Sequence, residues 1–110
     1  MSSRIERFAP TLRLLHGYNS KQKKRWIKKN LDSEFVYCLC ECAKNLLKGN
    51  VPLTLAQKKS LSRRKKELRE LARKKVSLKK KKQIVQSGGF LGALLGPIIS
   101  VLGGLFGGQN

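Results

Sequence analysis

Acidic side chains are scarce in this sequence: six Asp and Glu residues stand against 25 Lys and Arg, giving a formal net charge of +19. Ordinary solvated helix faces interleave the two signs in pairs three or four residues apart, and so few acids exclude that arrangement here. Because unneutralised charge of this size on a short chain repels itself, we expect a polyanionic partner. Nucleic acid and an anionic membrane are the two candidates.

Groups for catalysis and metal binding are few as well. The only histidine is His16, the acids make no predicted inward pair, and no phosphate-cradling glycine loop precedes a predicted helix. The three cysteines are Cys38, Cys40 and Cys42, and on a helix the middle one points away from the others, so one metal ion could not bind all three. We expect no enzyme activity, no cofactor and no metal site, and thiols that pack as small apolar groups.

Signals for secretion and for base readout are also absent. No apolar segment follows the first basic residues, so a secretory signal peptide is not supported. No zinc-finger, homeodomain or leucine-zipper spacing occurs, and residues 57–82 contain no aromatic side chain on which single-stranded bases could stack. For a nucleic-acid partner, this leaves contact with the phosphate backbone of duplex DNA.

Helical patterns begin near the N-terminus. Apolar residues at helical spacing predict a helix over residues 3–16, with a break near Pro10. A basic helix is expected over residues 21–29, with Ser20 as its N-cap. Together these short helices make a basic N-terminal arm, residues 1–31.

The strongest patterns predict two helices that pack as a hairpin. Asp32 is expected to be the N-cap of a helix that Gly49 ends, and the apolar residues between them follow the i, i+3, i+4, i+7 rule. Thr54 and Gln57 match a capping box, so a second helix is expected over residues 55–75. The expected core contacts are Phe35, Leu39, Ala43 and Leu46 against Leu61, Leu68 and Leu71.

A last short helix is expected over residues 78–86, with Ser77 as its N-cap. We therefore predict an all-α protein, built as a small basic helical hairpin over residues 32–86 with flanking short helices. An apolar, glycine-rich C-terminal tail follows over residues 90–110. The residues between them, 87–89, form a Ser-Gly-Gly junction.

The basic residues are concentrated in one segment. Residues 57–82 hold fourteen of the 25 Lys and Arg residues and only two acids, a net charge of +12. Many mobile charges with no single reading head are typical of sequence-independent binding to phosphates. The candidate DNA-binding residues are Lys58, Lys59, Arg63, Arg64, Lys65, Lys66, Arg69, Arg73, Lys74, Lys75, Lys79, Lys80, Lys81 and Lys82.

The C-terminal tail has the opposite composition. No charged residue occurs after Lys82, and the seventeen residues 90–106 contain one polar side chain, Ser100. This length falls short of the ~20 residues that a membrane-spanning helix needs. Small residues recur at every fourth position, which lets apolar helices approach closely in lipid or in assemblies, although a glycine-rich flexible end is the other interpretation. The candidate packing residues are Gly92, Gly96, Ser100 and Gly104.

Parts of the sequence are similar to a viral protein family. Ser87-Gly-Gly-Phe-Leu-Gly-Ala-Leu-Leu-Gly-Pro-Ile-Ile resembles the end of the adenoviral precursor of the small core peptide mu, where a basic segment also precedes Gly-Gly-Phe-Leu. Glu41-Cys-Ala-Lys-Asn-Leu-Leu-Lys-Gly-Asn-Val-Pro-Leu-Thr and Lys75-Val-Ser-Leu-Lys-Lys-Lys-Lys resemble the corresponding protein of Polinton/Maverick elements and adintoviruses. The likeness covers residues 32–106. The basic region departs from mu, because it is mostly Lys rather than Arg and His.

The resemblance implies a minor virion core protein that condenses double-stranded DNA, found in the virion and the host nucleus. It also implies a precursor that is cut by an adenovirus-type cysteine protease, which prefers an aliphatic or similar residue, any residue and Gly-Gly before the cut. Residues 86–89 meet this pattern except at Gln86, which is not aliphatic. The implied cleavage residues are Gly88, Gly89 and Phe90, and the tail would then contact capsid proteins or membrane.

Two other functions remain open. The first alternative is a membrane-active or membrane-anchoring virion peptide precursor, whose basic region binds lipid head groups. The second is a ribosomal or other RNA-binding protein. The apolar tail argues against the second, because free ribosomal extensions are seldom this apolar.

Overall fold

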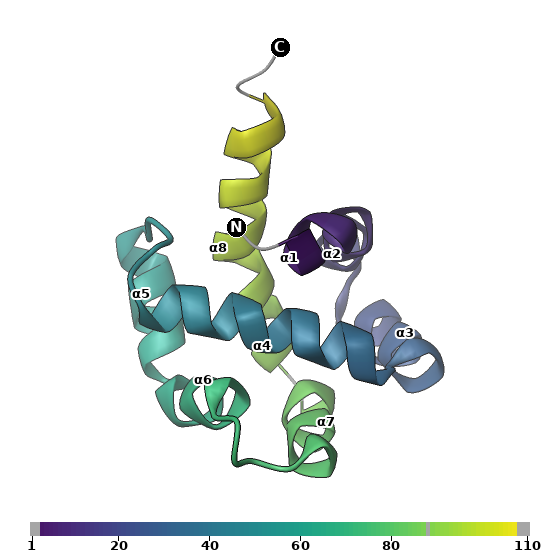
Figure 1. Ribbon diagram of the computed structural model, residues 1–110. Helices are drawn as coiled ribbons and strands as arrows, with labels where there is room; N and C mark the ends of the chain where they lie inside the picture. Colours follow the sequence, from purple (N-terminus) through teal and green to yellow (C-terminus); the bar gives the residue numbers. More distant parts are fainter. Residues whose placement is uncertain (1–2, 88, 108–110) are drawn as a thin grey trace.

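The computed structural model describes residues 3–87 and 89–107, with side chains described as far as Leu102. The described residues form eight helices and no strand, which confirms the expected all-α class (Figure 1). The helices are α1 Ser3–Arg7, α2 Ala9–Gly17, α3 Ser20–Asn30, α4 Ser33–Leu47, α5 Leu55–Ser62, α6 Lys65–Ala72, α7 Leu78–Gln86 and α8 Phe90–Gly107.

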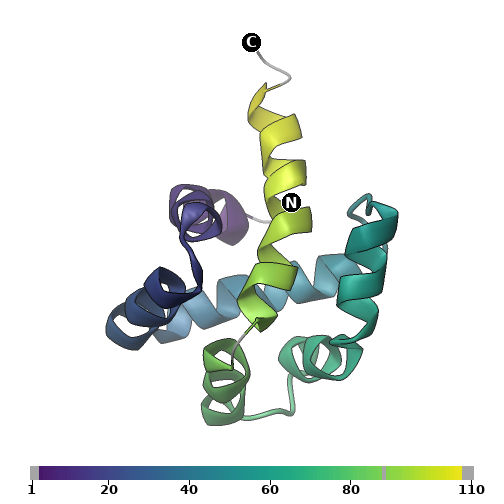
Figure 2. The same cartoon turned by 180° about the vertical axis from the view of Figure 1, so that it is seen from behind.

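Two helices, α4 and α8, cross at the centre of the molecule, and the other six surround them. In Figure 1 α4 runs across in front of α8, and Figure 2 shows α8 from the opposite side. The helix α8 contacts α2, α5, α7 and α4, whereas α4 also contacts α1, α6 and α7. Hydrophobic burial against these two helices therefore joins the N-terminal helices to the basic segment.

The described part of the expected tail differs from a free appendage, because α8 supplies much of the core. Five of its large apolar side chains are at most 1% exposed, and these are Phe90, Leu94, Leu95, Ile98 and Leu102. The guanidinium Nη2 of Arg13 on α2 donates to the carbonyl oxygen of Leu102 at 3.3 Å. The physical reason is that residues 90–102 are the longest apolar stretch of the chain, and burying each large side chain contributes about 1.5–3 kcal/mol.

An aromatic cluster attaches the N-terminal helices to α4. The ring of Phe35, on α4, lies between Phe8, at the break between α1 and α2, and Trp26 on α3. The ring centroids are 5.5 Å apart for Phe8 and 5.1 Å apart for Trp26, both in edge-to-face geometry. Such pairs contribute about 0.5–1.5 kcal/mol each beyond their buried area. The contacts with Phe35 therefore help to hold α1, α2 and α3 against α4.

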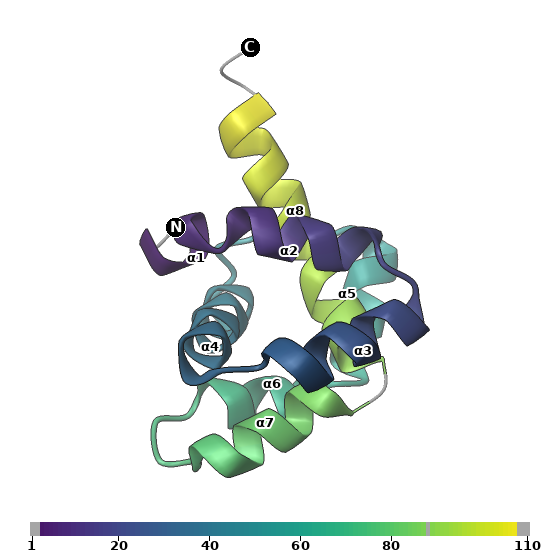
Figure 3. The ribbon, with the colours of Figure 1, turned by 90° about the vertical axis from the view of Figure 1, so that its right-hand side faces the viewer.

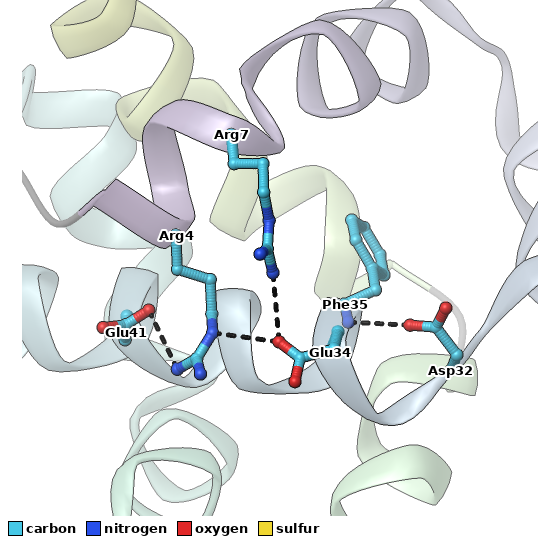
Figure 4. Close-up of polar contacts among 6 residues, drawn as sticks. All are labelled: Arg4, Arg7, Asp32, Glu34, Phe35 and Glu41. Carbon is cyan, nitrogen blue, oxygen red and sulfur yellow. Dashed lines mark hydrogen bonds and ion pairs between the residues drawn. The ribbon is translucent and has the colours of Figure 1, made fainter.

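Ion pairs on the surface join α1 to the same helix (Figure 4). Arg4 pairs with Glu34 at 3.3 Å and with Glu41 at 3.5 Å, and Arg7 pairs with Glu34 at 3.1 Å. These side chains are partly or largely exposed, so each pair contributes at most about 1 kcal/mol. Their main consequence is that two of the six acids are already paired with arginines of α1.

Four of the expected helix ends are confirmed. Asp32, Thr54 and Ser77 each accept a hydrogen bond from the backbone N–H three residues on, and Gln57 completes the capping box of α5. Gly49 ends α4 with φ at +76°, in the left-handed region that favours glycine. These ends depend on local chemistry, which explains why the sequence alone predicts them.

The expected cap of α3 is wrong by one residue. The side chain of Asn19, not of Ser20, accepts the hydrogen bond from the backbone N–H of Gln22, at 2.9 Å. The side chain of Gln22 in turn accepts from the backbone N–H of Asn19, which completes a capping box. Asn is as good an N-cap as Ser, and the reciprocal bond from Gln22 selects the earlier position.

The expected helix over residues 55–75 is divided into α5 and α6. The chain leaves helical geometry at Arg64, where φ is −117° and ψ is 20°. The break has a packing cause, because α5 packs against α8 whereas α6 packs against α4, and these two central helices cross. One straight helix could not follow both, although the expected hairpin of α4 with α6 is present and buries Leu68 and Leu71.

No single helix among the described residues is long and apolar enough to cross a membrane. Taken together, α7 and residues 90–102 of α8 have the length and apolar composition of a membrane span, but the two segments meet at an angle of 90°.

The burial of α8 predicts the effect of a simple substitution. Leu95→Ala should destabilise the protein by about 2–5 kcal/mol, because it leaves a cavity around a side chain that is 0% exposed. Leu55→Ala is the matched control, since Leu55 is 71% exposed, and it should change stability by less than about 0.5 kcal/mol. Urea unfolding followed by circular dichroism measures both. Equal stabilities for the two variants would contradict a core built on α8.

Candidate nucleic-acid interface

The candidate DNA-binding side chains lie mostly on the surface of α5, α6, α7 and the loops between them. Eleven of the fourteen are exposed, and Arg64 and Lys82 are half-buried. We call these thirteen residues the basic surface; they are Lys58, Lys59, Arg63, Arg64, Lys65, Lys66, Arg69, Arg73, Lys74, Lys75, Lys79, Lys80 and Lys82. Figure 1 shows that these helices form the lower and left-hand border of the molecule.

The charges of the basic surface form no ion pair with the residues that the structure describes. Among the described residues, the ion pairs join α1 to α4, and none includes a cation of α5, α6 or α7. The two acids of this segment are Glu67 and Glu70 on α6, and the Oε2 atom of Glu67 is buried and makes no hydrogen bond with described groups. The positive potential of this surface is therefore directed at solvent or at a polyanion.

One predicted contact residue, Lys81, does not belong to this surface. It is 7% exposed and lies near Cys40 of α4, where burial raises the pKa of the thiol and the positive charge of the lysine opposes this larger effect. The reason is the position of Lys81 on α7, beside Ile84 and Val85 on the face that packs against α4. A run of four lysines on a helix must direct at least one of them inward, and here it is Lys81.

The helix α3 adds cations that the sequence interpretation did not include. It packs beside α7, as Figure 3 shows, although about fifty residues separate the two helices in sequence. All of its cations are exposed except Lys23, which is half-buried, and they are Lys21, Lys23, Lys24, Arg25, Lys28 and Lys29. The available signal was an acid-free basic run over residues 21–29. Only the fold shows that this run lies next to α7.

The predicted cleavage residues lie where α7 ends and α8 begins. Gly89 is exposed with φ at +81°, and Phe90 is buried at 1% exposure. A Cβ atom on Gly89 would lie 2.6 Å from Nη2 of Arg64. Gly88 lies outside the described residues. Glycine at position 89 thus has a structural reason that is independent of any protease, because the backbone conformation there favours it.

The small residues of the tail do not face the core. Gly92 and Ser100 are exposed and Gly96 is half-buried, while the large apolar side chains between them are buried. Gly104 lies beyond the residues whose side chains are described. Within the described part of α8, large residues pack inward and small residues lie toward the outside.

The thiols of Cys38, Cys40 and Cys42 are buried, and none of them forms a disulfide. A hydrogen bond with Cys38 and burial raise the pKa of Cys42 well above its usual value, and burial raises the pKa of Cys40 despite the nearby Lys81. Protonated, buried thiols are poor nucleophiles and poor metal ligands. No group of three possible metal ligands occurs among the described residues.

Comparisons with known proteins add no relative. A scan against protein-family models, a search of curated proteins and a search of solved structures each find no match for this chain.

The conformation of Gly89 predicts a cost for adding a side chain. Gly89→Ala should destabilise the fold by about 1–2 kcal/mol, because an L-residue is strained at this positive φ. Gly17→Ala is the control: a Cβ there meets nothing within 4 Å, so the change should be neutral or stabilise by up to about 1 kcal/mol. Urea unfolding of both variants decides the matter, and an unaffected Gly89→Ala would remove the proposed conformational role.

Proposed function

We propose that this protein binds double-stranded DNA through its phosphates, without sequence specificity, and condenses it as a minor core protein of a virion that acts in the host nucleus. The observation that carries the proposal is the basic surface, whose cations form no ion pair with described residues. Such a surface attracts phosphates without selecting bases. The resemblance to the adenoviral mu precursor and to its Polinton relatives supports the viral context.

Condensation requires that charge be neutralised on more than one stretch of DNA. The basic helices α3 and α5 lie at opposite ends of α4 (Figures 1 and 2), and α6 and α7 lie between them. Cations are therefore available on several sides of a molecule with a radius of gyration of only 13.1 Å. This distribution favours contact with two neighbouring duplexes, or with a bent one, over contact with a single straight duplex.

The resemblance also supports cleavage by an adenovirus-type cysteine protease between Gly89 and Phe90. The scissile bond follows an exposed glycine where α7 has ended, and the flexible side chain of Arg64 lies beside that glycine. The buried side chains of α8 lie immediately after it. Cleavage on this proposal breaks the chain without removing α8 from the core.

The alternative, a membrane-active or membrane-anchoring virion precursor, requires α8 to leave the core. Leu94, Leu95 and Ile98 are each 0% exposed, so the apolar face that would enter lipid is already covered. Moving them into lipid would expose to water the apolar faces of α2, α4 and α5 that they cover, at a cost of about 25 cal/mol per Å². We therefore favour DNA binding, with capsid proteins as further partners of the exposed side of α8.

The DNA proposal predicts a steep salt dependence. If about ten cations contact phosphates, a plot of log K against log salt concentration should have a slope near −9, equal for two unrelated duplexes. Lys74→Gln combined with Lys75→Gln should reduce that slope by about 2, because two phosphate contacts are lost. Titrations of the full chain by fluorescence anisotropy at several salt concentrations measure this.

A charge-matched control is Arg7→Gln combined with Lys48→Gln, which removes two positive charges outside the basic surface. It should leave the slope nearly unchanged. A flat salt response, a strong preference for one duplex, or equal slopes for the two double variants would each contradict the proposal. Circular dichroism confirms that both variants are folded.

The cleavage proposal predicts two fragments, residues 1–89 and 90–110, when the full chain is incubated with an adenovirus-type protease. Gln86→Leu should speed the cut, because it restores the aliphatic residue of the protease pattern at an exposed position. Since α8 is buried, the fragments should co-elute in gel filtration and separate only in denaturant. Mass spectrometry identifies the products. An intact chain for both wild type and Gln86→Leu would show that the junction only connects two helices.

A further inference from the structure

A large cavity among the described residues lies outside the basic surface. It has a volume of about 650 Å³ and opens between α3, the end of α7 and the start of α8. This size is in the range of small-molecule sites, which usually measure about 300–1,000 Å³. We call it the junction cavity, because Gln86, Ser87 and Gly89 form one of its edges.

Three lysines of α3 line one wall of this cavity. Lys23, Lys24 and Lys28 share a helix face with Ile27, which is 4% exposed and fixes the orientation of that face. No acidic residue lines the cavity. Three ammonium groups around one concave space, with no carboxylate to balance them, make an environment that a bound anion would stabilise.

The opposite wall belongs to α8. Because Gly92 in this wall has no side chain, an ammonium group can come close to it. A Cβ atom on Gly92 would lie 3.9 Å from Nζ of Lys23, so this half-buried lysine is held against the first turn of α8. The backbone N–H groups of a first turn have no partner within the helix. Leu91 and Gly92, which line the cavity, carry two of these groups, and apolar Val85 of α7 completes the lining.

We propose that the junction cavity binds a phosphate group, held by Lys23, Lys24 and Lys28. The phosphate can come from a free phosphate ester or from the backbone of a bound duplex, because both present the same tetrahedral anion to the lysines. Ammonium groups bind such anions as point charges, so the site requires charge and proximity more than a fixed fork geometry. The proposal does not depend on DNA binding by the basic surface.

The first experiment uses inorganic pyrophosphate as the probe and the full chain in solution. Lys23→Gln combined with Lys28→Gln should weaken pyrophosphate binding roughly tenfold or more, since losing one charge-assisted hydrogen bond corresponds to about that factor. Isothermal titration calorimetry gives the affinities. Amide chemical shifts of residues 89–92 report whether the anion is in the cavity.

The matched control is Lys21→Gln combined with Lys29→Gln, which removes the same charge from the same helix at exposed positions that do not line the cavity. It should retain pyrophosphate affinity within about twofold. Equal loss in the two double variants, or no measurable binding by the wild type, would overturn the proposal. Thermal melts show whether both variants fold.

A second arm distinguishes the sources of phosphate. If the duplex supplies it, the cavity variant should lower the salt slope of DNA binding by up to about 2 relative to the control. Pyrophosphate should then compete with the duplex. If a free ester is the ligand, DNA binding should be the same in both variants while pyrophosphate binding still differs. Failure of the basic surface is seen separately, as a loss of DNA binding that leaves pyrophosphate binding intact.

Discussion

Burial of α8 is the constraint on which the rest of this structure depends. Every charged side chain lies between Arg4 and Lys82, and α2, α4, α5 and α7 of that region pack against α8. Because α8 carries no charge, it adds buried apolar area without adding to a net charge of +19. A self-repelling chain of 110 residues buries only a modest share of its surface, so an uncharged apolar helix is a large addition to its core. The uncharged, apolar composition that suggested a separate tail is therefore the composition that a buried core helix requires.

The placement of the acids follows from the same constraint. Glu34 and Glu41, on α4, pair with arginines of α1 and help to hold the N-terminal helices over the core. The acids that remain are too few to balance α3, α5, α6 and α7. The molecule thus has one surface where charges pair internally and another where they do not. This division, more than the total charge, makes a polyanion the expected partner.

Sequence reasoning succeeded where the cause is local. The caps at Asp32, Thr54 and Ser77 and the stop at Gly49 involve hydrogen bonds or backbone angles within a few residues, and all were predicted. It failed where two distant segments meet: α8 with α2 and α5, α3 with α7, and Lys81 with Cys40. The division of the predicted helix at Arg64 belongs to the second class, because only the crossing of α4 and α8 requires it. The junction cavity lies between three such segments, so no sequence pattern could reveal it.

Charge and fold oppose each other in this protein, and a polyanion would resolve that opposition. The cations of the basic surface and of α3 lie on helices that pack around the same two central helices, so their mutual repulsion acts directly against the packing of α4 and α8. A ligand that binds the folded state and neutralises these cations stabilises that state by mass action. The same ligand also removes repulsion that the isolated chain has to overcome. The proposed binding of phosphates is therefore linked to the integrity of the core, because α8 packs against α5 and α7 and holds these basic helices in place.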